Sequence, residues 1–202
     1  MAFKMTPALK AYMKRTLDLV GDKDPHALLK GAPGKFERAT RGMNAAALSR
    51  RPARGKWSIV EQVGHLADVE VVFAGRIRRA MAEPGSAAQP FDQDVWVEKL
   101  QHRKANFKTL LGAWRALREA NLALVAAAPR RTRAEGFAQH PERGRQPVDF
   151  QLLFLAGHDL NHLGQVGRIR KQFAAKKTAA RRAPARGAKK GAGRSAKKGA
   201  RR

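Results

Sequence analysis

The sequence predicts an all-α protein: an antiparallel four-helix bundle with an extra short N-terminal helix and a disordered C-terminal tail. Across residues 1–173, apolar residues recur at spacings of 3, 4 and 7, the period of an amphipathic helix, and no segment shows the alternation of a strand. Four long segments of this kind, separated by polar loops, favour a helix bundle. Residues 174–202 lack every aromatic residue, Leu, Ile and Val, so they cannot form a core.

Helix-start signals predict the first elements in order. Thr6–Pro7 has the pattern of an N-cap followed by proline, which predicts a short helix over about 7–20. Asp24–Pro25 repeats that pattern and predicts the start of a second helix. The sequence GAPG at 31–34 is expected to weaken or break this helix, which then resumes over about 35–48.

A capping box predicts the next long helix. Ser58 is followed three residues later by Glu61, so the side chain of each can satisfy a free backbone N–H of the other. The helix is expected to run to about Met81, with an apolar stripe along one face. A loop rich in Pro, Gly, Ser and Asp is expected over 83–94.

The last two bundle helices follow. A broad apolar face begins at Phe107 and its helix is expected to end before Pro129. A polar, basic loop is expected over 130–146. The final helix is predicted over about 147–173, and its first half is apolar nearly all round, so we expect it at the centre of the bundle.

Composition excludes several classes of protein. The chain has 202 residues and no cysteine, which excludes a disulfide scaffold, a thiolate metal site and a cysteine nucleophile. The length fits one domain, so we divide the chain into a bundle over 1–173 and a tail over 174–202. The N-terminus lacks the apolar run of a signal peptide, and no apolar stretch approaches the ~20 residues of a membrane span. We therefore expect a soluble cytoplasmic protein without a membrane partner.

The net charge of +26 is divided between the bundle and the tail. The tail holds 12 of the 42 basic residues and no acid, which leaves the bundle with a net charge of +14. Basic doublets spaced by small residues suit a flexible polycation that binds nucleic acid without reading its sequence, and a solubilising extension is the alternative. The nucleic-acid contacts would be Lys176, Lys177, Arg181, Arg182, Arg186, Lys189, Lys190, Arg194, Lys197, Lys198, Arg201 and Arg202.

Three histidines form a candidate metal site. His158 and His162 lie four residues apart in HDLNH, so both imidazoles project from one face of the last helix. Alone this spacing is common by chance, and His65 alone, in mid-helix among apolar neighbours, would be interpreted as a core histidine. Together they predict a shared divalent ion, zinc or nickel, because burying three imidazoles without a shared ligand would be costly. Three ligands leave coordination positions open, as in catalytic sites.

Other polar and aromatic residues have weaker roles in this interpretation. Asp92 and Asp94 could approach the open side of the metal, although capping of the local loop is favoured. Gln165, three residues after His162, is a candidate to bond a metal-bound water. Asp159 is expected to point to another face. We expect three surface histidines and three core tryptophans, namely His26, His102 and His140, and Trp57, Trp96 and Trp114.

Three motifs together resemble a known family. They are KWSIVE at 56–61 followed by HLAD at 65–68, FDQDVW at 91–96, and HDLNHLGQ at 158–165. In order and spacing they are similar to those of the DinB-like (DinB/YfiT) metal-binding four-helix bundles, over about 20–172. The resemblance implies that His65, His158 and His162 are the metal ligands, with water completing the coordination. It also implies relatives that use low-molecular-weight thiols, and others described as damage-inducible.

These observations favour a metal-dependent enzyme acting on a small molecule. A bound ion would activate water or a thiol, so a transferase, isomerase or hydrolase is expected, with a low-molecular-weight thiol as a candidate cofactor. The first alternative is a nucleic-acid-associated protein, in the nucleoid or in damage response, that acts through its tail and has a non-catalytic metal site. The second is a non-catalytic metal or ligand binder. A homodimer is compatible with the sequence, although no exposed apolar stripe identifies an interface.

Overall fold

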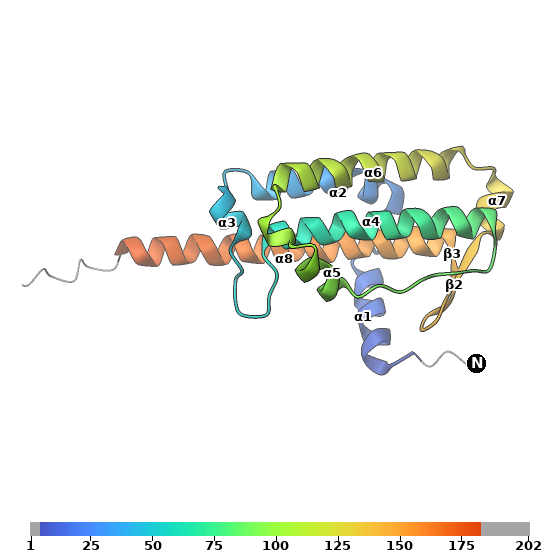
Figure 1. The fold of residues 1–202 in the computed structure, drawn as a ribbon, viewed down its shortest axis with the longest axis horizontal. Helices are drawn as coiled ribbons and strands as arrows, with labels where there is room; N and C mark the ends of the chain where they lie inside the picture. Colours follow the sequence, from blue (N-terminus) through green and yellow to red (C-terminus); the bar gives the residue numbers. More distant parts are fainter. Residues whose placement is uncertain (1–4, 183–202) are drawn as a thin grey trace, which may run out of the picture.

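The computed structural model describes residues 5–182, and most of these residues are helical. Four long helices form the bundle, and a shorter one, α1 (Pro7–Asp18), packs against the last of them (Figure 1). The long helices are α2 (Pro25–Thr40), α4 (Ile59–Ala82), α6 (Phe107–Ala127) and α8 (Val148–Arg182). The predicted four-helix bundle with a short N-terminal helix is therefore confirmed.

The order of the helices around the bundle differs from the order along the chain. α4 packs against α6 and α8, and α2 packs against the same two helices, so α2 and α4 lie on opposite sides of the bundle. The pairs α4–α8 and α2–α6 run antiparallel, whereas α4 and α6 run in the same direction (Figure 1). This parallel pair requires the long connection over 83–106, which carries the chain back along α4 before α6 begins.

Short elements fill the connections between these helices. A three-stranded sheet pairs β1 parallel to β2, and β2 antiparallel to β3. The expectation that the chain has no strands is therefore wrong, because these strands are too short to show an alternating pattern. The short elements are α3 (Ala45–Ser49), β1 (Ser86–Ala87), α5 (Gln93–Lys99), the 3-10 helix η1 (His102–Lys104), α7 (Arg130–Glu135), β2 (Phe137–His140) and β3 (Gly144–Pro147).

The second helix continues through the GAPG segment, contrary to the expected weakening or break. Pro33 has no N–H to donate to the carbonyl of Leu29, one turn earlier. That carbonyl instead accepts a hydrogen bond of 3.0 Å from Arg118 of α6. The helix ends at Thr40 rather than near 48, and Gly42 follows with a φ of +80°, before Asn44 caps the separate helix α3.

The last helix extends beyond its expected end at 173. Residues 174–182 continue α8, so the first part of the predicted disordered tail is helical. This segment is rich in alanine and lacks glycine, a composition with high helix propensity. The rest of the predicted tail, including its basic residues from Arg186 onward, lies outside the described residues. No helix within 5–182 is long and apolar enough to cross a membrane.

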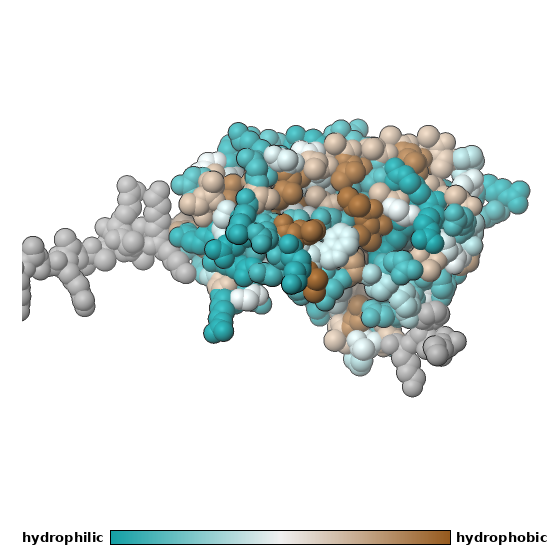
Figure 2. All heavy atoms as spheres, viewed as in Figure 1, coloured by the Kyte–Doolittle hydropathy of each residue, from teal (hydrophilic) through white to brown (hydrophobic). Residues whose placement is uncertain are grey.

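The surface that Figure 2 shows is mostly hydrophilic, with apolar groups exposed among the polar ones. Val71 on α4 and Val95 on α5 are each about half exposed. Inside the bundle, two clusters of apolar side chains divide α8 between them. One cluster includes α8 residues between 148 and 156, and the other includes residues between 166 and 173. The intervening turns of α8 carry the buried polar residues His158, Asp159 and His162.

One guanidinium joins all four long helices inside the bundle. Arg118 of α6 is 1% exposed, and it donates to Glu70 of α4 and to Asp159 of α8, each at 2.7 Å. Its third partner is the Leu29 carbonyl of α2. Asn121 donates to the second oxygen of Glu70 at 2.8 Å. Asp159 therefore points toward α6.

Replacing Arg118 should destabilise the bundle strongly. Arg118→Met would leave the Glu70 and Asp159 carboxylates buried without a cation, so we expect the free energy of unfolding to fall by about 3–5 kcal/mol. Urea unfolding followed by circular dichroism measures this. Arg115→Met is the matched control, because Arg115 forms an exposed ion pair with Glu37 and its loss should cost about 1 kcal/mol or less. Equal losses in the two variants would contradict the role of Arg118.

Two glycines of α8 should respond in opposite ways to alanine. A Cβ at Gly157 would lie 2.0 Å from the backbone carbonyl oxygen of Thr16, so Gly157→Ala must push α1 away from α8. We expect it to cost about 1–3 kcal/mol. A Cβ at Gly167 would meet nothing within 4 Å, so Gly167→Ala should stabilise the helix by up to about 1 kcal/mol. Thermal unfolding compares them, and a neutral Gly157→Ala would contradict the close packing of α1.

Candidate metal centre

Three imidazoles from two helices meet inside the bundle. His65 comes from α4, and His158 and His162 come from the facing turns of α8. One ring nitrogen of each lies within 4.8 Å of the others, and the Nε2 atoms of His65 and His158 are 3.2 Å apart. All three side chains are buried. The structure thus brings together the three histidines that the sequence singled out.

The start of α4 is held in place on the N-terminal side of His65. Ser58 and Glu61 form the predicted capping box, and the Glu61 carboxylate also pairs with Arg51. A Cβ at Gly64 would lie 2.5 Å from the His102 ring, so η1 packs directly on α4 beside His65. The expectation that His102 lies at the surface is wrong. Its ring is buried and bonds to Asp68 at 2.6 Å.

Burial keeps the three imidazoles neutral. It lowers the pKa of His65 and of His158 well below the ordinary value of 6.5, with a further lowering from the neighbouring imidazoles. Burial also lowers the pKa of His162 to about 4. Neutral imidazole is the form that binds a metal ion, because protonation would occupy the lone pair.

The remaining ring atoms test whether these residues fit a metal ion. Nδ1 of His162 lies 3.3 Å from the side-chain oxygen of Gln62, which favours the tautomer with a free lone pair on Nε2. Within residues 5–182, Nδ1 of His65 and Nδ1 of His158 are buried without a hydrogen-bond partner. Two nitrogens bound to one tetrahedral zinc ion lie about 3.3 Å apart, close to the observed separation of the two Nε2 atoms. The donor set therefore fits a divalent metal ion.

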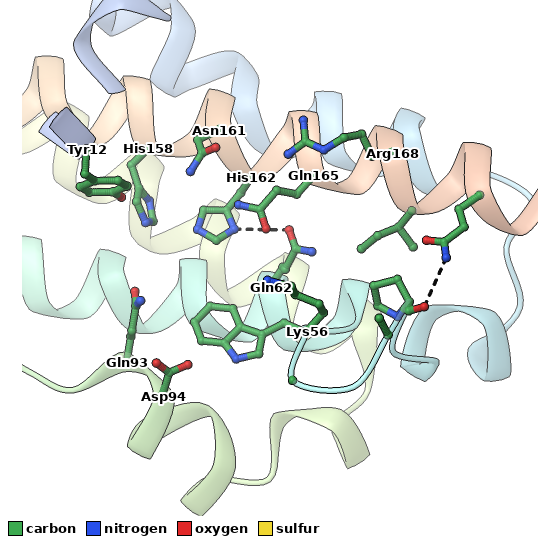
Figure 3. Close-up of a pocket in the computed structure, with 16 residues that line it drawn as sticks. Tyr12, Lys56, Gln62, Gln93, Asp94, His158, Asn161, His162, Gln165 and Arg168 are labelled. Atoms are coloured by element: carbon green, nitrogen blue, oxygen red, sulfur yellow. Dashed lines mark hydrogen bonds between the residues drawn. The ribbon is translucent and has the colours of Figure 1, made fainter. Parts of the chain in front are cut away.

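A cavity of about 690 Å³ opens on one side of the histidines (Figure 3). His158 and His162 form part of its wall, together with Trp57. The Trp57 ring stacks at 6.3 Å from that of His162 and lies 4.9 Å from that of His65. Trp57 is only half-buried, so its expected place in the core is wrong, whereas Trp114 is fully buried. Trp96 is also half-buried and packs on Phe91.

The cavity also includes some of the weaker candidates. Gln165 and Asp94 line it, and Figure 3 shows them on opposite sides of the histidine region. Asp92 caps α5, where its carboxylate accepts the N–H groups of Asp94 and Val95 at 3.0 Å. This is the capping alternative that the sequence favoured, and the catalytic roles of Asp94 and Gln165 stay predictions.

A second cavity of about 450 Å³ is lined by His65 and His158. His140 of β2 lines it and is 3% exposed, so the expectation that His140 is a surface residue is wrong. Its Nδ1 accepts the backbone N–H groups of Glu142 at 3.1 Å and Arg143 at 3.3 Å. His26, the third histidine expected at the surface, is partly exposed at the start of α2.

Sequence reasoning missed two residues of the first cavity. Gln62 lies three residues before His65, on the same face of α4, and that spacing was a usable signal. Tyr12 of α1 reaches both cavities beside His158 (Figure 3), and nothing in its helix marks it.

The stability of the protein should depend on His140 in acid. Burial and the nearby Arg143 and Arg76 lower the pKa of His140 to about 4, while the unfolded chain protonates near 6.5. As the pH falls from 6.5 toward 4, the unfolded state binds the proton first, so stability is lost in this window. His140→Asn, which keeps an acceptor for the backbone N–H groups, should lose less stability there. Urea unfolding between pH 7 and 4 measures it, with His26→Asn as the control; equal pH slopes in wild type and His140→Asn would contradict this.

Comparisons with known proteins agree with this fold. A protein of Geobacillus kaustophilus (strain HTA426), named as a putative metal-dependent hydrolase, is 26% identical over 153 residues, which are 72% of this chain and 82% of that protein. The structure of YfiT from Bacillus subtilis is described as a probable metal-dependent hydrolase with an unusual four-helix bundle topology. It is similar in fold, with a TM-score of 0.68 at 18% identity, over 86% of this chain and 93% of that chain. Residues 28–166 match the DinB superfamily, and the chain belongs to that superfamily.

Proposed function

We propose that His65, His158 and His162 bind one divalent metal ion, and that the protein uses it to hydrolyse a small molecule. The observation that carries this proposal is the convergence of three buried, neutral imidazoles beside an open cavity. A divalent ion bound there would supply a Lewis acid that activates water or polarises a substrate oxygen. Zinc and nickel are the ions we expect, because both suit imidazole ligands.

The residues around the histidines would orient the ligands and the substrate. Gln62 holds His162 through Nδ1, which keeps Nε2 available as a ligand. Trp57 covers one side of the histidine cluster and limits access of water from that side. The carboxylate of Asp94 lines both cavities, where it would accept a proton, and the amide of Gln165 would donate a hydrogen bond to a substrate oxygen.

Hydrolysis is the reaction we favour because both relatives carry that description in their names. Transfer to a low-molecular-weight thiol stays a prediction, and the chain has no cysteine, so the thiol would have to come as a small molecule. Nucleic-acid binding by the basic tail, a homodimer and a cytoplasmic location also stay predictions.

Metal content tests the proposed ligands. Protein purified without a histidine tag should contain about one divalent ion per chain, and His65→Ala and His158→Ala should each remove nearly all of it because two imidazoles bind far more weakly than three. Inductively coupled plasma mass spectrometry measures the number of metal ions per chain. His26→Ala is the matched control and should keep its metal. Full metal content in both His65→Ala and His158→Ala would contradict the assignment.

Hydrolysis is tested on the same proteins. A panel of small ester and amide substrates should be cleaved by the metal-loaded wild type and by His26→Ala, and not by His158→Ala. Activity that survives both chelation and His158→Ala would contradict a reaction at this site.

A further inference from the structure

We propose that the second cavity holds an anionic group of the substrate, a carboxylate or a phosphate, between Arg76 and Arg143. The proposal deepens the proposed function, because the same cavity is lined by His65 and His158. A substrate of this protein would then carry a negative charge on one side of the histidines and its reacting bond beside them.

Arg76 is a buried cation without a carboxylate partner in the part of the chain that the structure describes. It lies on α4 and is 7% exposed. One of its terminal nitrogens donates to the backbone carbonyl of Gln89, and its Nε is buried without a partner among the described residues. It forms no ion pair within that part of the chain. Burial lowers its pKa to about 10, with a further lowering from Arg143, so the folded protein bears the cost of this charge.

Arg143 brings a second guanidinium to the same cavity. It lies in the turn between β2 and β3, and its guanidinium sits over the Phe154 ring, 5.3 Å from the ring centre. Its Nε is also buried without a hydrogen-bond partner within residues 5–182. Burial lowers its pKa, and the charge of the adjacent Glu142 offsets that only in part. Two partly desolvated guanidiniums in one cavity repel each other unless an anion lies between them.

Arg118 is a buried guanidinium with a structural role, and its partners can be compared with those of Arg76. That residue has two carboxylates and a backbone carbonyl as partners. Among residues 5–182, Arg76 has one backbone carbonyl and no carboxylate as partners, although it is nearly as buried. The difference shows that no residue among 5–182 supplies a carboxylate for Arg76, and we assign that place to the anionic group.

His140 adds a neutral donor to this cavity. Its Nδ1 accepts two backbone N–H groups, which places the ring proton on Nε2. A neutral N–H group can bond an anion without adding a third positive charge. Three carboxylates also line the cavity, those of Asp92, Asp94 and Glu142, but Asp92 caps α5 and none forms an ion pair with Arg76 or Arg143. All three are exposed, so they lie toward the rim.

The two cavities meet where a substrate could extend through both. Tyr12, His158, Gln93 and Asp94 line each of them. An anionic group between the two guanidiniums would be bound by charge-assisted hydrogen bonds, and both carboxylate and phosphate match the fork of an arginine. The rest of the molecule would lie beside the histidines, toward the larger cavity.

Anion binding tests the proposal. The full-length protein is titrated by calorimetry at constant ionic strength, with inorganic phosphate in one arm and acetate in the other, both metal-free and metal-loaded. We expect one saturable site per chain for at least one anion, and the tighter arm identifies the preferred group. The dissociation constant should rise at least tenfold in Arg76→Met and in Arg143→Met. Arg115→Met removes the same charge from the outer surface and should leave it unchanged.

The metal-free arm separates this proposal from the proposed function. Saturable binding that depends on Arg76 or Arg143 without metal supports the anion site even if the three histidines bind no ion. Absence of saturable binding of either anion would overturn the proposal. Binding that weakens equally in Arg76→Met, Arg143→Met and Arg115→Met would also overturn it, because the anion would then be bound by general surface charge. Two separate cavity variants keep the result readable if one of them fails to fold, which circular dichroism detects.

Discussion

The ion pairs of Arg118 are the interaction on which the rest of the structure depends. This one side chain contacts α2, α4 and α8, so it ties every long helix to α6. Its partner Asp159 is the residue next to His158, and its partner Glu70 lies little more than one turn after His65. The network therefore sets how α4 and α8 face each other, and with that it brings the three imidazoles into one place. Pro33 contributes by leaving the Leu29 carbonyl free to accept the third bond.

Buried polar groups in this bundle fall into two kinds. Around Arg118 each buried charge has an oppositely charged partner that holds the helices together, although Nη2 of Arg118 and Oδ1 of Asp159 have no hydrogen-bond partner among residues 5–182. Around the two cavities the compensation by residues 5–182 is incomplete. Nδ1 of His65 and Nδ1 of His158 have no hydrogen-bond partner there, and the guanidiniums of Arg76 and Arg143 have no carboxylate partner there. Burying such groups unsatisfied is costly, so each needs a physical explanation, and a bound ion or ligand is one such explanation. The proposed metal ion would be the partner of the imidazoles, and the proposed anionic group would be the partner of the two guanidiniums.

Local signals in the sequence were enough to predict the starts of the first long helices and the histidine cluster. The caps at Thr6, Asp24 and Ser58 mark helix starts because side-chain oxygens there satisfy free backbone N–H groups. The i, i+4 spacing of His158 and His162 forces both rings to one face. The burial of His102 and His140 could not be predicted, because it depends on short segments that fold back over α4 and α8. The partial exposure of Trp57 could not be predicted either. Nor could the continuation of α2 through Pro33, because there a side chain from another helix takes the place of a local hydrogen bond.

Anomalous diffraction from crystals of the full-length protein is the most direct test of the central claim. Data collected on both sides of the zinc and nickel absorption edges should show one strong peak per chain, within bonding distance of a ring nitrogen of His65, His158 and His162. Imidazoles that bond only to one another, with no anomalous peak between them in protein supplied with both metals, would contradict it.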